Sequence, residues 1–524
     1  MLFNSPVYLF LFLPCTVFVY FLLNRFRFAQ AATAWLVLAS LFFYRYWNAS
    51  YLLILITSIL VNFALGTMLR KTGKKSNPAK RYRVAHKTVL FTGVFFNIAL
   101  LGYYKYTDFF FENANQLLHT SLTLPHLALP LAISFFTFQQ IAYLVDCSKK
   151  NAEEYDFLSY CLFVSFFPQL IAGPIVHHQE MMPQFRRLRN RVFSSPNAAL
   201  GLFFFSLGFF KKVWIADQFA AWASKGFATE TALTLFDAWG TSLSYTFQLY
   251  FDFSGYTDMA IGSALFFNIV LPINFNSPYQ ATSIQDFWRR WHMTLSRWLR
   301  DYLYIPLGGN RKGELRTYCH LFITFFLAGL WHGAGWTFVL WGGLHGAALI
   351  LHRLWKKIGL RIPAIFGWLF TFLFVNTTWV IFRATNLQQG FQVLKGMVGA
   401  NGVTTEASVQ KVFQRIEVVQ PYLAKLSGTL VLPGQMYWFL LFFSLVLFLL
   451  PNSCQIAGMV RKEKKEYIAS SKIGVLQLAV MKTTDFLLSF RPNCYWALLS
   501  GILFSMALYR LLRVEPTEFL YFNF

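Results

Sequence analysis

Residues 50–69 read SYLLILITSILVNFALGTML, a stretch that has no charged side chain. About 20 apolar residues are enough for an α-helix to cross the hydrocarbon of a bilayer. Comparable apolar stretches occur near residues 5–24, 31–47, 88–106, 127–146, 198–216, 238–252, 365–383, 436–450 and 494–513. Because these stretches are continuous rather than alternating, the sequence predicts an all-α, polytopic integral membrane protein and excludes an outer-membrane barrel.

The composition excludes other classes of protein. Only 13% of the 524 residues are charged, against about 25% in soluble proteins, and 19% are aromatic, which excludes a disordered chain. The 46 Lys and Arg outnumber the 22 Asp and Glu, and they lie in short segments between the apolar stretches. This placement indicates membrane topology and contact with anionic lipids, and it argues against nucleic acid as a partner. Six scattered cysteines without a CxxC motif indicate no metal site and no disulfide framework.

Positive charge orients the predicted helices. Arg25 and Arg27 follow the first apolar stretch, which places the N-terminus outside. The basic segments 180–191 and 286–316 face the cytoplasm only if 157–172 and 258–273 are re-entrant, and Pro168 and Pro272 supply breaks for such hairpins. The result is about twelve crossings with both termini outside, and two re-entrant elements in one chain indicate an internal chamber.

We expect one membrane-embedded domain over residues 1–524. Its parts are N-terminal helices (1–150), a catalytic core with re-entrant and amphipathic helices (151–355), and C-terminal helices (356–524) with an extracytoplasmic loop near 384–434. No internal repeat is present, which argues against an inverted-repeat transporter.

The densest polar segment is DFWRRWHMTLSRWLRDY at residues 286–302. On a helical wheel it forms one amphipathic helix, with His292 at the edge of an aromatic face. The aromatic face includes Trp288, Trp291 and Trp298, and the opposite face carries Arg289, Arg290, Arg297 and Arg300. This helix is either an interfacial anchor or a surface for phosphate groups, which arginine binds through two hydrogen bonds.

Two further segments place polar side chains at membrane depth. In LWHGAGW (330–336), His332 lies between tryptophans and small residues, and an ionisable side chain inside a membrane indicates function. In QLYFDFSGYTD (248–258), the polar residues form either a packing seam, with Asp258 capping the next helix, or a surface that faces substrate. The residues concerned are Asp252, Ser254, Tyr256 and Asp258.

Together these motifs resemble the membrane-bound O-acyltransferases, most closely the bacterial alginate O-acetyltransferase subfamily. The resemblance rests on 286–310, LWHG at 330–333, QLYFDFSGYTD at 248–258, LIAGP at 170–174 and FLYFNF at 519–524. It implies that His332 and His292 are catalytic residues. It also implies a binding site for the acyl donor at Arg289, Arg290, Trp291 and Arg297. It further implies a helical bundle around a central funnel through the membrane, with a substrate tunnel lined by Asp252, Ser254, Tyr256, Asp258 and Trp331.

The implied reaction moves acetyl groups from cytoplasmic acetyl-CoA, which is a substrate, so no bound cofactor is expected. His332 would be the general base, and His292 would either form a hydrogen bond within the tunnel or help to position the thioester. The resemblance further implies the bacterial inner membrane, a periplasmic SGNH-type partner, and alginate or a similar exopolysaccharide as acceptor. Peptidoglycan and cellulose remain open as acceptors. Outside this class, a transporter of an acyl or glycan carrier is the alternative.

Overall fold

The computed structural model describes residues 1–73, 80–149, 156–171, 173–403, 432–459, 490–514, 517 and 519–520, and these are helical or irregular, without a β-strand. The helices are α1 (Leu13–Arg25), α2 (Ala29–Arg45), α3 (Ala49–Gly73), α4 (Lys80–Leu118), α5 (Ile133–Ser148), α6 (Phe157–Ser165), α7 (Phe167–Leu170), α8 (His178–Arg186), α9 (Ser195–Phe210), α10 (Asp217–Ala228), α11 (Leu235–Leu265), α12 (Ile284–Arg290), α13 (Met293–Leu299), α14 (Ile305–Leu307), α15 (Glu314–His332), α16 (Trp336–Ile358), α17 (Ala364–Arg383), α18 (Leu387–Met397), α21 (Gln435–Leu449), α22 (Ser453–Ile456) and α25 (Cys494–Leu511). Three π-helical segments, Tyr8–Phe12, Lys211–Ala216 and Arg300–Tyr304, extend α1, α9 and α13.

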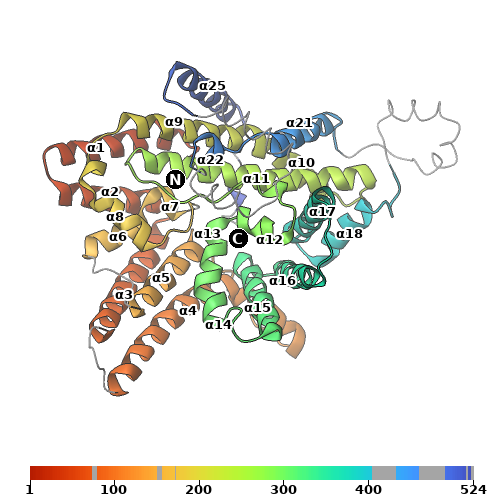
Figure 1. Cartoon of the computed structure of the whole chain (residues 1–524), viewed down its shortest axis with the longest axis horizontal. Helices are drawn as coiled ribbons and strands as arrows, with labels where there is room; N and C mark the ends of the chain where they lie inside the picture. Colours follow the sequence, from red (N-terminus) through yellow and green to blue (C-terminus); the bar gives the residue numbers. More distant parts are fainter. Residues whose placement is uncertain are drawn as a thin grey trace.

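Helix α11 is the centre of the molecule, and α9 runs along it (Figure 1). Glycines allow this close approach, because a Cβ at Gly262 would lie 2.6 Å from the Gly201 carbonyl oxygen and one at Gly255 would lie 2.8 Å from that of Gly208. Small residues at such crossings let helix backbones pack closely within a membrane.

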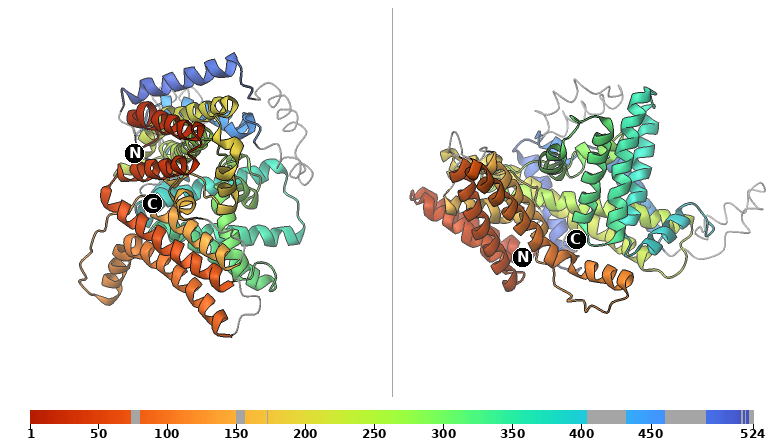
Figure 2. Two further views of the ribbon diagram at one scale, coloured as in Figure 1. Left: turned by 90° about the vertical axis from the view of Figure 1, so that its left-hand side faces the viewer. Right: turned by 90° about the horizontal axis from the view of Figure 1, so that it is seen from below.

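The other helices form two groups beside this centre. Figures 1 and 2 show α3, α4 and α5 packed together on one side and the α15–α16 hairpin with α17 on the other. The short helices α12, α13 and α14 lie between the two groups. This arrangement places the two histidine motifs in the interior.

Six helical stretches of the described chain are long and apolar enough to cross a membrane: Tyr8–Arg25, Ala49–Thr72, Val84–Leu118, Ser195–Ala228, Ala364–Arg383 and Cys494–Leu511. The protein is therefore a multi-pass, all-α membrane protein, as the sequence predicted. Within the apolar stretch 127–146 the helix begins only at Ile133, because Pro125 and Pro130 precede it. Part of the loop 384–434 is helix α18, and its residues 404–431 lie outside the described chain.

The structure corrects the predicted break before residue 258. Helix α11 is continuous from Leu235 to Leu265, so 258–273 is not a separate re-entrant hairpin. Gly255 and Gly262 do not break the helix because they pack against α9. The chain leaves α11 through a turn at Asn268, whose φ is 60°, and Pro272 lies in the extended segment that follows.

The first suspected re-entrant segment, 157–172, is a broken helix. Helix α6 ends at Ser165, Phe166 adopts a non-helical conformation, and Pro168 lies in the first turn of α7. Proline is tolerated at this position because the first-turn amides have no partner within the helix. Both short helices are largely buried in the protein, as broken backbone at membrane depth requires.

Candidate active site

The segment 286–302 is not one amphipathic helix, as the sequence predicted, but two helices joined at Trp291 and His292. Helix α12 ends at Arg290, and His292 has a φ of 44° in the left-handed region. The extended segment 274–276 stabilises the break, because Asn276 N donates to Arg290 O (2.9 Å) and Met293 N donates to Asn274 O (3.0 Å). The helical wheel predicted one helix because the spacing of aromatic and charged residues continues across the break. The turn contains no glycine or proline that would have marked it in the sequence.

His292 is held in one orientation by this break. Its side chain is 0% exposed, and its Nδ1 lies 3.1 Å from Asn274 Oδ1. That oxygen also accepts hydrogen bonds from the amide and hydroxyl of Thr294 (3.3 and 3.0 Å). Because a carbonyl oxygen only accepts, the proton of His292 lies on Nδ1, and Nε2 is the acceptor nitrogen.

A stack of aromatic rings connects the two histidine motifs. Phe138 of α5 stacks on Trp298 of α13, with ring centroids 3.7 Å apart, and on Trp331 of α15, at 4.9 Å. The Trp331 ring is 6.5 Å from the His292 ring and 4.9 Å from the His332 ring. The predicted catalytic pair and the predicted tunnel residue Trp331 therefore lie together, although His292 is in the break between α12 and α13 and the other two residues end α15.

His332 is the last residue of α15 and is 4% exposed. The helix ends at Gly333, where a Cβ would collide with the Phe338 ring, so the turn requires glycine. The last carbonyls of a helix have no partner within it. Here Lys105 Nζ of α4 donates to Trp331 O (2.5 Å), His332 O (3.1 Å) and Ser134 Oγ (3.3 Å). All three protons of the ammonium group are thus bonded, two of them to the turn that carries His332.

A large cavity of about 1040 Å³ opens beside α12, α13 and α15. Its basic lining consists of Arg187, Arg289, Arg297 and Arg300. Arg297 binds Glu180 of α8 through both of its terminal nitrogens (2.5 and 2.9 Å). Arg289 is exposed and forms no salt bridge with a described residue. This cavity combines excess positive charge with an apolar wall, which suits a phosphorylated ligand that also carries an apolar group.

A small cavity of about 250 Å³ lies at the other end of α15. It is lined by the turn residues Gly333 and Ala334, by Lys105 and Asp108 of α4, and by the irregular segment before α5. Helix α15 lines the large cavity with Leu321, Thr324 and Phe325 and ends at the small one. His332 is seven residues beyond Phe325, about 10 Å along the axis, so it lies between the two cavities.

Not all of the predicted donor-site residues line the large cavity. Arg289 and Arg297 do, but Arg290 donates to Asp286 Oδ2 (2.9 Å) within α12. Trp291 is buried against Phe287 and Trp379 (ring centroids 5.7 and 5.1 Å).

The predicted tunnel residues on α11 line neither cavity. Asp252 forms an ion pair with Lys212 (2.6 Å), and Asp258 forms one with Lys211 (2.7 Å). Asp258 lies inside α11, so it does not cap the next helix. Tyr256 stacks on Phe519 (4.3 Å), and Ser254 is buried beside the Asp258 pair. Of the two hypotheses for this segment, the packing seam fits these contacts.

Several residues that shape the site were missed in the sequence. Lys105, Asn274 and Glu180 hold His332, His292 and Arg297, respectively. Lys105 could have been identified from the sequence, since it is a lone charged residue inside an apolar stretch. Glu180 and Asn274 could not, because the residues they bind are distant in sequence or lie beyond a turn.

Comparison with known proteins identifies the class. The model of the membrane-bound O-acyltransferase family matches residues 40–388, which include α3 through α17 and both histidine motifs. The chain belongs to this family, and it is an acyltransferase of the membrane.

Its relatives carry more specific names. The peptidoglycan O-acetyltransferase of Helicobacter pylori is 52% identical over 434 residues, which cover 77% of this chain and 81% of that protein. The probable alginate O-acetylase of Pseudomonas aeruginosa is 40% identical over 404 residues, covering 76% and 75%. The teichoic acid D-alanyltransferase of Streptococcus thermophilus is 26% identical over 238 residues, covering 43% and 57%.

Proposed function

We propose that the chain transfers acetyl groups from acetyl-CoA to a hydroxyl group of a cell-envelope polysaccharide, with His332 as the general base. The observation that carries the proposal is the position of His332, buried between a large basic cavity and a small cavity at opposite parts of α15. If the acyl donor and the acceptor enter from opposite sides of a membrane, the catalytic base must lie between their two binding sites.

The chemistry follows from a neutral imidazole. A ring nitrogen of His332 accepts the proton of the acceptor hydroxyl as the oxygen attacks the thioester carbonyl carbon. The C–O bond forms, the C–S bond breaks, and the proton passes to the departing thiolate. His292, with its proton fixed on Nδ1 by Asn274, lies near enough to position the thioester within the same aromatic enclosure.

The two cavities give the reaction a direction. The large cavity has four arginines, and excess positive charge marks the cytoplasmic side of a bacterial inner membrane. The small cavity lies beside residues 104–108 of α4, and the segment 107–125, which begins there, has no Lys or Arg. Acetyl-CoA would therefore bind from the cytoplasm, and the acetyl group would leave on the periplasmic side.

For the acceptor we favour peptidoglycan over alginate. The relative named for peptidoglycan is 52% identical, and the relative named for alginate is 40% identical over a similar share of the chain. The described part of the chain contains no separate soluble domain that could deliver acetyl groups to a glycan. A periplasmic SGNH-type protein remains our expectation for that step.

The acceptor can be tested by deleting the gene and measuring ester-linked acetate separately in purified peptidoglycan and in secreted polysaccharide. We expect the acetate of peptidoglycan to fall to background and to return when the intact gene is restored. Loss from the secreted polysaccharide alone would reject peptidoglycan, and no loss from either fraction would reject the proposed acetylation.

Replacing Arg289 with glutamine should raise the apparent KM for acetyl-CoA about fivefold, because an exposed ionic contact contributes about 1 kcal/mol. The kcat should change little, since the contact is made equally in the ground and transition states. Initial rates in membrane vesicles measure both values. Arg316→Gln is the matched control, because Arg316 is exposed on α15 and does not line the cavity. An equal KM in Arg289→Gln and in the control would place the donor elsewhere.

Because 258–273 is not a hairpin, the orientation of the segment 286–316 now rests on its positive charge and not on the count of crossings. The positive-inside rule predicts that positions 189 and 312, both exposed, face the cytoplasm. Single cysteines there, in a protein that lacks its native cysteines, should resist an impermeant thiol reagent in intact spheroplasts and react in inside-out vesicles. A cysteine at the exposed Ser121 should show the opposite pattern. Labelling of position 189 or 312 in intact spheroplasts would show that this position faces outward, which contradicts the proposed orientation.

A further inference from the structure

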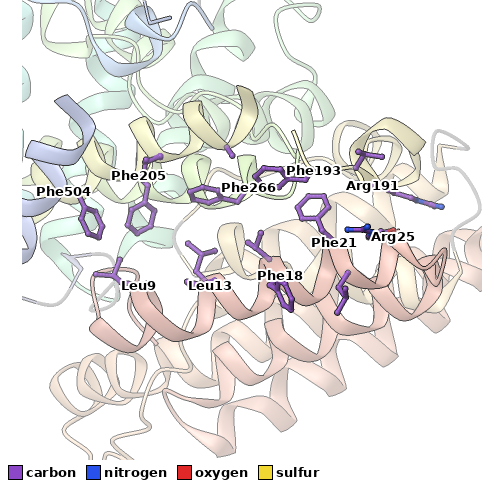
Figure 3. Close-up of a pocket in the computed structure, with 17 residues that line it drawn as sticks. Leu9, Leu13, Phe18, Phe21, Arg25, Arg191, Phe193, Phe205, Phe266 and Phe504 are labelled. Atoms are coloured by element: carbon purple, nitrogen blue, oxygen red, sulfur yellow. The ribbon is translucent and has the colours of Figure 1, made fainter. Parts of the chain in front are cut away.

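A second sizeable cavity lies on the flank of the bundle, far along the chain from both histidine motifs. It has a volume of about 860 Å³ and lies where α1 faces α9, with Phe504 of α25 at one end. Figure 3 shows its apolar walls: Leu9, Leu13, Phe18 and Phe21, on α1 and the π-helical segment before it, lie opposite Phe205 and Phe266. Phe18 and Leu202, which also line it, are exposed at 67% and 44%, so the cavity opens on the outer surface of the helices.

The cavity is apolar over most of its length but basic at one end. Arg25, the last residue of α1, and Arg191, which follows α8, lie together at that end in Figure 3. Neither guanidinium forms a salt bridge with a residue of the described chain. Two neighbouring cations without an acidic partner create a site for an anion.

The basic end marks one boundary of the membrane. Tyr8–Arg25 is one of the helical stretches that can cross it, so Arg25 lies at its edge. The positive-inside rule assigns this edge to the cytoplasmic side. The lining residues of α1 run from Leu9 to Arg25, about 24 Å of helix. This length exceeds the half-thickness of the hydrocarbon, about 15 Å.

We propose that this cavity binds one anionic phospholipid of the cytoplasmic leaflet, with its phosphate on Arg25 and Arg191 and an acyl chain between α1 and α9. Arginine binds phosphate through paired, charge-assisted hydrogen bonds, and basic pockets between membrane helices on this side recognise lipid headgroups. The apolar walls supply the energy of chain burial, and the arginines supply the preference for negative charge. The bound lipid would join the N-terminal helix to α9 and α25 and would stabilise their packing.

The charge at one end favours a lipid over the membrane anchor of a partner protein. An apolar transmembrane anchor offers no reason for two arginines without a salt bridge at the end of an apolar cavity. A phospholipid accounts for both the apolar walls and the charge.

The test is native mass spectrometry of the full-length protein in detergent, mixed with phosphatidylglycerol or with phosphatidylcholine of the same acyl chains. We expect phosphatidylglycerol, which has a net negative charge, to be retained about tenfold better, because the choline cation of phosphatidylcholine offsets its phosphate charge beside the arginines. The double variant Arg25→Gln/Arg191→Gln should remove this preference. Arg27→Gln/Arg189→Gln changes the same charge in the same two segments, at exposed positions that do not line the cavity, and should keep it.

Ala198→Trp provides an independent test of the apolar part. Ala198 lines the cavity from α9, so an indole there should reduce retention of both lipids while leaving the arginines in place. If lipid retention is unchanged in both the Arg25/Arg191 and the Ala198 variants, the proposal is overturned. If the Arg27/Arg189 control loses the preference for phosphatidylglycerol to the same extent, the preference comes from general surface charge and not from this cavity. Loss of a membrane-anchored protein partner, with lipid retention unchanged, would make the cavity a protein interface instead. None of these measurements depends on acetyl transfer.

Discussion

Replacement of His332 by alanine is expected to lower acetyl transfer by at least about 100-fold, while the protein still inserts into the membrane. A positioned general base contributes about 10²- to 10⁴-fold to a rate, and His332 lies where the proposed donor and acceptor sides meet. Its ring contacts Trp331, Trp341 and Phe382, with centroids 4.9–5.3 Å away, so the imidazole is enclosed by aromatic rings. Ester-linked acetate and the amount of protein in the membrane fraction are the two measurements.

Two further variants separate catalysis from folding. His332→Gln keeps a polar side chain of similar size but cannot accept a proton at neutral pH, so it should be as inactive as the alanine variant. His320→Ala removes an imidazole from the same helix, where its Nδ1 is near Gly309 O (2.9 Å), and should retain most of the activity. Near-normal acetate in cells with stable His332→Gln protein would refute the role of His332.

Replacement of Lys212 by methionine should give the largest loss of stability. Lys212 binds Asp252 (2.6 Å) and Asp217 (2.8 Å), and all three side chains are buried. Removing the cation leaves two carboxylates buried with no charge to balance them. Breaking a buried ion pair in this way costs about 3–5 kcal/mol. We expect a much lower Tm in detergent and less protein in the membrane fraction.

Lys225→Met is the control for this variant, because Lys225 is exposed on the neighbouring helix α10. It should leave the Tm unchanged. Adding Asp252→Asn to Lys212→Met should recover part of the loss, since one of the two uncompensated charges is removed. If Lys212→Met is as stable as the control, the ion pairs are not what joins α9 and α10 to α11.

Much of the architecture could be predicted because membrane helices are marked by length and hydropathy. The apolar stretches near α1, α3, α9, α17 and α25 correspond to helices of the structure. The end of α11 was predicted wrongly, because the apolar stretch ends at residue 252 and the positive charge of 286–316 then required a hairpin over 258–273. Asp252 and Asp258 pair with lysines 40 and 47 residues earlier in the chain, and no local pattern shows that such charges are neutralised inside a helix.

The candidate site, too, could be predicted only in part from the sequence. The aromatic character of the 286–302 segment was predictable, and Trp288, Trp291 and Trp298 are buried. The left-handed turn at His292 was not, since it depends on the distant Asn274. His332 was marked as a lone ionisable residue at depth, and the same rule applied to Lys105 would have found the residue that holds its turn.

The most direct test of the proposed mechanism is vectorial acetyl transfer in sealed vesicles. Labelled acetyl-CoA is supplied only to the cytoplasmic face, and base-labile acetate is measured on glycan enclosed at the periplasmic face, with the native partner proteins present. The account predicts label on the enclosed glycan with the intact protein and none with His332→Gln. Equal labelling with His332→Gln, or labelling only when acetyl-CoA is supplied at the periplasmic face, would contradict it.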